Sequence, residues 1–343
     1  MPGLIRDRTP LNGSHDGSKS QRSRPHRPTV TEVRIADAWA ELARSLDGLR
    51  VAFYESYEPV HGFLPGSPAS DECSRDATLA GTWGTSPVRD ANIAPLSPLL
   101  VLFDHLDTLA SVFRSPGGVT ASHTLARAIL DIAIGPWYLL EPGIGERERV
   151  RRYMNLRLQS LKEQVQLEAG SDSTAIRDHS TDRIALITKA ARAHGFEVRR
   201  EGDRYRAPYL DSQMPSTTSL AAEMIAPQAP TLGPLFWRMG SAIAHGQHHG
   251  ISMFFERQDL AVDPAHGDAA VRIQTSSKDT ALRCGGAPLA VIATLGRFFA
   301  QYGWDATKLR AAEADVIDVC QTVAGVQKSG IPGTFRAKGS ASA

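Results

Sequence analysis

The sequence predicts a mostly α-helical protein, a helical bundle with a small β-hairpin insertion and disordered termini. Between residues 29 and 326, apolar residues recur mostly at intervals of three and four, the spacing of one face of a helix. One stretch alternates as a strand does, and residues 1–28 and 327–343 contain almost nothing to bury. No composition shift divides the chain near its middle. Residues 29–326 are therefore expected to form a single helical domain.

The composition indicates a globular protein without a strong overall charge. Hydrophobic residues make up 42% of the 343 residues, which is enough for a core. The chain has 38 Lys and Arg against 37 Asp and Glu, for a formal net charge of +1. No bulk field therefore attracts nucleic acid or a membrane, and any such partner must be recognised through local charge.

Cysteine usage and apolar runs favour a cytoplasmic protein with no membrane partner. The 3 cysteines contain no C-x-x-C pair, which favours reduced thiols over a disulfide framework. The N-terminus has no apolar segment of the kind found in secretory signals. The apolar runs 125–140 and 287–300 are interrupted by Arg127 and Asp131 and by Arg297, so neither is a good membrane span.

The first elements are predicted from capping and breaker residues. Thr29 and Glu32 form a capping-box pattern that begins a helix ending near Gly48. Residues 55–93 are rich in proline and glycine and predict a long irregular connection. Ser97-Pro98 then predicts the start of a helix whose leucine and phenylalanine residues share one side.

Later elements follow the same reasoning. Phe196 begins an alternating run around the turn Glu201-Gly202-Asp203, which predicts the hairpin. Helices are expected before and after it, at 122–140, 146–168, 172–195, from Ser219, at 232–245, 287–302 and 307–324.

The most suggestive pattern for function lies between Phe236 and Gly250. Arg238 and His245 are about two helical turns apart, so on a continuous helix both side chains leave the same face. A histidine titrates near neutral pH and can move a proton, and a fixed arginine can stabilise charge developing on a phosphate. Arg238 and His245 are therefore the predicted catalytic residues.

This segment resembles the R-x4-6-H motif of the HEPN superfamily, helical-bundle proteins of bacterial toxin, defence and RNA-processing systems. The resemblance implies a metal-independent endoribonuclease that needs no cofactor, with RNA as substrate and the arginine and histidine at a homodimer interface. It also implies that the substrate's own 2′-hydroxyl attacks the adjacent phosphate. The chain departs from the family at Met239, where many active members have a polar residue such as asparagine. A looser likeness is that of Leu125–Asp131 to an arginine-containing helix of uncharacterised bacterial helical proteins.

Three further residues are predicted to support the pair. Arg127 and Asp131 are four positions apart on an otherwise apolar helix, so they are expected to be buried, paired and close to the 232–245 helix. Ser241 lies between Arg238 and His245. The same residues also fit a structural interpretation, in which Arg127 and Asp131 only fix packing and small residues let the 232–245 helix approach its neighbour.

A metal site is the alternative use of the histidines. His245, His248 and His249 stand close together in the sequence, and histidine is the commonest transition-metal ligand. Gly246 and Gly250 are expected to stop the helix, which places His248 and His249 in a turn. Further ligands would come from elsewhere, such as Asp104, His105 and Asp107.

Three functions therefore stay open. The first is a HEPN-like protein that binds or cleaves RNA by metal-independent acid/base chemistry. The second is a non-catalytic helical interaction module, and the third is a metal-dependent enzyme using the 245–249 histidines. No Walker loop, dinucleotide glycine fingerprint or Gly-x-Ser-x-Gly motif is present.

Overall fold

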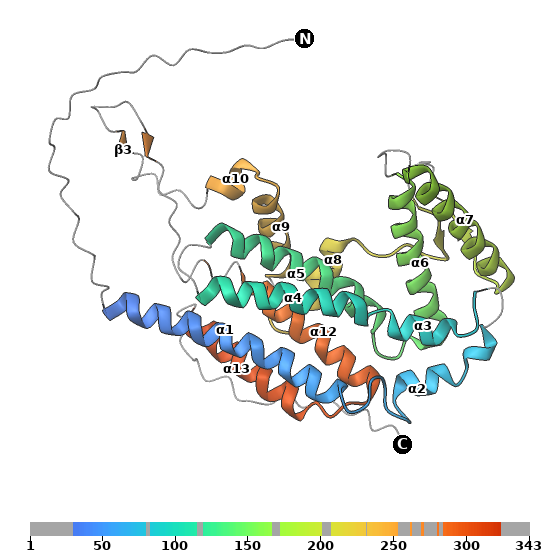
Figure 1. Cartoon of the computed structure of the whole chain (residues 1–343), viewed down its shortest axis with the longest axis horizontal. Coiled ribbons are helices and arrows are strands. Elements are labelled where there is room, and N and C mark those ends of the chain that lie inside the picture. The colour runs from blue at the N-terminus through green and yellow to red at the C-terminus, as the bar shows by residue number, and fades with distance from the viewer. Residues whose placement is uncertain are drawn as a thin grey trace, which may run out of the picture.

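The computed structural model shows a mostly helical fold with a small hairpin, as the sequence predicts (Figure 1). It describes residues 30–79, 83–114, 119–166, 172–200, 207–230, 232–252, 261–262, 269–270, 280 and 284–323. The segments 1–28 and 327–343, for which disorder is expected, lie outside the described residues.

The main core is built by long helices that run side by side. Helix α1 (Val30–Tyr57) packs between α13 (Thr307–Val323) and α4 (Leu96–Arg114) (Figure 1). Helix α4 packs on α5 (Val119–Leu139), and α5 packs on α12 (Gly286–Tyr302). The apolar stripes of these helices meet in one buried cluster, because each stripe needs an apolar partner to leave water.

A second, smaller core lies around α6 (Gly145–Val165) and α7 (Asp172–Ala193), which project from one end of the main bundle (Figure 1). Their inner faces pack with α3 (Pro87–Ile93) and the hairpin strands β1 (Val198–Arg199) and β2 (Tyr209–Leu210). The buried side chains include Val88, Val150, Met154, Leu158, Phe196 and Leu210.

A buried polar network joins the two cores. Arg149 of α6 is 0% exposed and donates two hydrogen bonds to Glu72, at 2.7 and 2.9 Å. Glu72 lies on α2 (Pro68–Cys73) and also accepts from Asn92 of α3 at 3.1 Å. Asn92 in turn accepts from Gln301 of α12 at 2.9 Å. Each of these four side chains therefore has a partner on another element, as burial requires.

The prediction of an irregular connection over residues 55–93 is wrong for much of its length. Helix α1 continues to Tyr57, and α2, a 3₁₀ turn (Asp76–Thr78) and α3 follow. Two of the prolines that indicate a break, Pro68 and Pro87, are instead the first residues of helices. Pro68 follows the N-cap Ser67, whose hydroxyl accepts from the amide of Ser70 at 3.2 Å. Proline is tolerated there because the first amide of a helix has no partner within the helix.

The hairpin is confirmed, but its second strand lies further along the chain. β1 and β2 are antiparallel, with Val198 opposite Leu210. The expected turn falls in residues 201–206, outside the described residues. β2 is held by α6, because Asn155 accepts from the Leu210 amide at 2.7 Å and Arg151 donates to the Ser212 carbonyl at 2.7 Å. A second two-stranded pair, β3 (Ala261–Val262) with β4 (Ala269–Ala270), is not predicted by the sequence.

The remaining helices are those expected, with small shifts in their ends, except for the unexpected four-residue helix α10 (His248–Ile251). Helix α8 (Thr217–Ile225) and helix α9 (Gly233–Ala244) both pack on α5 and on each other. The N-cap of α8 is Ser216, whose hydroxyl accepts from the amide of Ser219 at 3.1 Å. Helix α9 carries the predicted site.

One stretch passes a test for membrane-spanning helices. Pro87–Arg114, which contains α3 and α4, is long and apolar enough by length and composition alone, and 33% of its most apolar window is buried. Core helices of proteins that never meet a membrane pass the same test, so this is weak evidence. The inner side of α4 packs in the main core.

Candidate functional site on helix α9

Arg238 and His245 lie on one side of a continuous helix, as predicted. Helix α9 runs unbroken from Gly233 to Ala244, and His245 is its C-cap. Two turns of helix therefore separate the two side chains, which point to the same side. Both residues are exposed, and within the described part of the chain neither has a hydrogen bond or ion pair through its side chain.

The end of α9 is a Schellman motif. Gly246 has φ +65°, a left-handed conformation that glycine adopts without strain. Its amide donates to the Ile243 carbonyl at 3.0 Å, and the amide of Gln247 donates to the Ala242 carbonyl at 2.8 Å. Gly246 is thus the helix stop that the sequence indicates.

Gly250, in contrast, is not a helix stop. It lies within the short helix α10 (His248–Ile251) and is buried against α9, where a Cβ would be 2.7 Å from the Ala242 carbonyl carbon. The prediction is wrong because this glycine serves close packing of two helices, which local sequence does not reveal. His248 and His249 consequently lie in a helix and not in a turn.

The described residues contain no complete ligand set for the alternative metal site. His245, His248 and His249 are all exposed, and no three or more His, Cys, Asp or Glu in the described ranges come close enough to hold an ion. Two of the three suggested additional ligands, Asp107 and His105, have other contacts. Asp107 pairs with Arg50 at 3.1 Å, and the His105 ring lies 2.9 Å from the Val101 carbonyl.

Arg127 contacts α9, but through Trp237. Arg127 is buried, pairs with Asp131, and holds its guanidinium 4.2 Å from the centre of the Trp237 ring. The indole Nε1 of Trp237 donates to Asp131 at 3.2 Å. The ion pair and its closeness to α9 are as predicted. The burial of Asp131 is not, because its side chain is 45% exposed at the edge of α5.

Gly240 allows this contact. A Cβ at position 240 would lie 2.9 Å from Cβ and 3.0 Å from Cδ of Arg127, closer than real side chains approach. The small residues of α9 therefore bring it against the arginine of α5. Ser241, the third supporting residue, is half-buried, and its carbonyl accepts from the His245 amide at 3.0 Å.

The predicted residues thus form two groups on different sides of α9. Trp237 and Gly240 face α5 and the Arg127–Asp131 pair, whereas Arg238 and His245 face outward. Consecutive residues of a helix point about 100° apart, so one element can serve both groups. The sequence gives no sign that Trp237, an expected core residue, is the partner of the ion pair.

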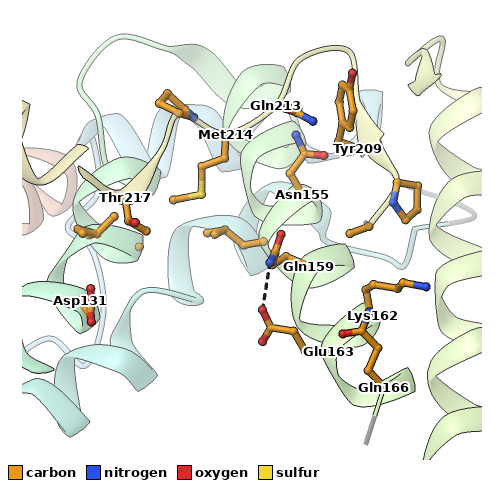
Figure 2. A pocket seen from close by; sticks show the side chains of 16 residues that line it. Asp131, Asn155, Gln159, Lys162, Glu163, Gln166, Tyr209, Gln213, Met214 and Thr217 are labelled. Atoms are coloured by element: carbon orange, nitrogen blue, oxygen red, sulfur yellow. Dashed lines mark hydrogen bonds between the residues drawn. The ribbon is translucent and has the colours of Figure 1, made fainter. Parts of the chain in front are cut away.

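Asp131 also lines a cavity of about 720 Å³ between α5, α6 and residues 207–217. Figure 2 shows Asp131 on one wall and Gln159 and Glu163 of α6 on the other, with the Gln159 amide donating to Glu163 at 3.0 Å. Met214 and Thr217 border the same space (Figure 2). The volume suits a small molecule, and neither residue of the predicted catalytic pair lines it.

Comparisons with protein-family models, with curated proteins and with solved structures gave no match to this chain.

Proposed function

We propose that the protein binds RNA on the outer face of α9 and cleaves it by metal-independent acid/base chemistry. The observation that carries the proposal is the exposure of Arg238 and His245 on one side of an unbroken helix. Nothing in the described part of the chain neutralises the arginine or covers the histidine, so both are accessible to a phosphodiester.

In this reaction His245 takes the proton of a ribose 2′-hydroxyl, and the 2′-oxygen attacks the adjacent phosphorus. The bond from phosphorus to the 5′-oxygen breaks, and that oxygen takes a proton from water. Arg238 stabilises the negative charge that develops on the phosphorane. The products are a 2′,3′-cyclic phosphate and a 5′-hydroxyl end. The Cα atoms of Arg238 and His245 are about 10 Å apart along the helix axis. The long arginine side chain can bring its guanidinium closer to the imidazole than that.

A second candidate is a non-catalytic helical interaction module. Leu235 is 50% exposed and lies one turn before Arg238 on the same outer side of α9. An exposed leucine in that position supplies an apolar contact for another helix, including that of a second copy of this chain. The homodimer belongs to both candidates, since an active site at an interface also needs the second copy.

The first test measures cleavage of single-stranded RNA by the wild type and by His245→Ala. Loss of the proton-transfer group should lower the rate by about 10²–10⁴-fold without unfolding the protein, because the residue is exposed. His249→Ala is the matched control, since His249 is also exposed but lies on α10, and it should cleave at the wild-type rate. EDTA should leave the rate unchanged.

Different outcomes separate the candidates. Undiminished cleavage by folded His245→Ala would show that His245 is not the base. Loss of cleavage in EDTA, together with sensitivity to His249→Ala, would favour the metal-dependent alternative. No cleavage by the wild type, with a dimer in sedimentation that Leu235→Asp separates, would favour the interaction module.

A further inference from the structure

Arg297 is the one charge in the apolar run of α12, and its side chain is held in a fixed position. Its neighbours Leu295 and Phe298 are fully buried, whereas Arg297 is half-buried. The guanidinium carbon lies 3.5 Å from the centre of the Trp137 ring, and Nη1 donates to the Trp137 carbonyl. Stacking and the hydrogen bond together fix the plane of the guanidinium, which fixes the direction of its other N–H groups.

The charge of Arg297 is poorly compensated compared with that of its neighbours. Arg149 is paired with Glu72, Arg151 with Glu148, and Arg152 with both Glu148 and Glu141. Within the described residues, Arg297 has no carboxylate within ion-pair distance. Burial lowers its pKa to about 10, and the more distant Glu141 and Glu223 offset this only in part. A partly desolvated cation of this kind gains free energy when an anion reaches it.

Two cavities meet at Arg297. One, of about 300 Å³, is bordered by Trp137, Glu223 and residues of α6 and the 212–215 segment, with Arg151 and Arg152 on its wall. The other, of about 500 Å³, lies between α8, α12 and α13 and is bordered by Met224, Ile292 and Glu313, among others. Volumes of this size admit a small molecule and exclude a folded polymer. The wall of the first cavity carries three guanidinium groups and the carboxylates Glu141 and Glu223. Arg151 and Arg152 are paired with Glu148, which leaves Arg297 as the guanidinium without an ion-pair partner among the described residues.

We propose that Arg297 binds the oxyanion of a small organic acid, a carboxylate or a phosphate monoester, in the 300 Å³ cavity. A guanidinium has five N–H donors in a rigid fork that matches two oxygens of such a group. Trp137, Pro215 and Leu220 provide apolar surface for the organic part. The carboxylate of Glu223, which also lines this cavity, provides an acceptor for a ligand hydroxyl or amino group. This site is separate from the outer face of α9 and does not depend on the proposed RNA cleavage.

The test titrates the whole protein with benzoate and, separately, with inorganic phosphate, at constant ionic strength set by sodium chloride. Binding is followed by calorimetry and by the unfolding temperature. Benzoate binding in preference to phosphate assigns a carboxylate ligand, and the reverse assigns a phosphate. Arg297→Lys keeps the charge but loses the fork, so association should weaken by about tenfold or more, and Arg297→Gln should abolish it. Arg192→Gln, on an exposed arginine of α7, is the control and should bind as the wild type does.

A second measurement uses only the wild type and does not depend on variants that fold. Phenylglyoxal modifies arginines, and mass spectrometry of the peptide containing Arg297 follows the rate. Each bound anion should slow modification of Arg297 and leave that of Arg192 unchanged. Equal binding by wild type and folded Arg297→Gln, or no response to either anion at concentrations on the order of 10 mM, would overturn the proposal.

Discussion

Arginine residues in this molecule differ in environment more than in sequence context. Arg149 is fully buried and paired, Arg127 is buried against an indole ring, and Arg238 is exposed. A guanidinium is suited to all three environments, since it binds carboxylates with two donors, stacks on aromatic faces and remains charged in water. What each arginine does is therefore decided by the partners that the fold brings to it.

Glu148 provides a pH-dependent prediction at the scale of one residue. Burial alone would raise the pKa of its carboxyl group, but hydrogen bonds from Arg151 at 2.6 Å and Arg152 at 2.8 Å outweigh that effect and lower it. A lowered folded-state pKa means that the contribution to stability is full above the ordinary value of 4.5 and is lost as pH falls through the folded value.

Glu148→Gln should therefore lower the free energy of unfolding near neutral pH. The difference between wild type and variant should shrink as pH falls from about 4.5 towards the lower folded-state pKa, because the unfolded chain takes up the proton first and the folded carboxylate is protonated only at the lower value. Urea unfolding at several pH values measures this. Glu58→Gln, at an exposed position, serves as the control with little effect. A difference that stays constant down to acid pH would show that the carboxylate charge is not what stabilises the fold here.

At the scale of elements, the contact between α5 and α9 depends on Gly240, which has no side chain to separate the two helices. The two helices meet where Gly240 lies over Arg127, and Trp237 covers the guanidinium from the same helix. Because Arg238 is the next residue after Trp237, the angle at which α9 docks on α5 also sets where the proposed catalytic pair faces. Packing and candidate function are thus linked through one helix.

Gly240→Ala should destabilise the protein by about 1–3 kcal/mol, because the new Cβ would overlap the Arg127 side chain near its base, where it cannot turn away. Gly135→Ala is the matched control. Gly135 is also in a helix, α5, but nothing lies within 4 Å of its added Cβ, so this change should stabilise by about 0.5–1 kcal/mol. Urea unfolding of both variants tests the pair, and equal effects of the same sign would contradict this account of the interface.

At the scale of the whole molecule, two apolar cores are joined through a buried ion pair. The larger core and the core around α6 and α7 share no buried residue, and Arg149, Glu72 and Asn92 connect the elements between them. A buried ion pair adds little stability compared with an apolar contact, but losing one partner leaves a charge without compensation. The junction is therefore the position at which a single substitution should matter most.

Arg149→Met should lower the free energy of unfolding by about 3–5 kcal/mol, because Glu72 is left buried without its cation. The double variant Arg149→Met with Glu72→Leu should recover much of this loss, since both charges are then absent. Chemical unfolding of Arg149→Met, Glu72→Leu and the double variant, each compared with the wild type, completes a double-mutant cycle. A single variant that loses less than about 1 kcal/mol would show that the pair is not sealed from water.

The sequence by itself determined the long helices and the side of α9 on which Arg238 and His245 lie, but not the short helices α2, α3 and α10. Helical periodicity and end signals such as Gly246 depend on residues within one or two turns, so the chain displays them directly. The same local signals failed at Pro68 and Gly250, where one residue type serves two structural purposes. Residue 68 begins a helix, and residue 250 allows two helices to approach.

Only the tertiary structure decided which side chains meet. Trp237 bonds Asp131 across 106 positions, and Arg149 bonds Glu72 across 77. The same packing left Asp131 at an edge, 45% exposed, and placed Arg297 between two cavities with no ion-pair carboxylate among the described residues. Such pairings depend on how helices dock, and docking is set by the summed fit of many apolar side chains from distant segments. Local sequence does not record these contacts between distant segments. The periodicity of a helix can therefore be predicted from its own residues, but the partners of its charged side chains cannot.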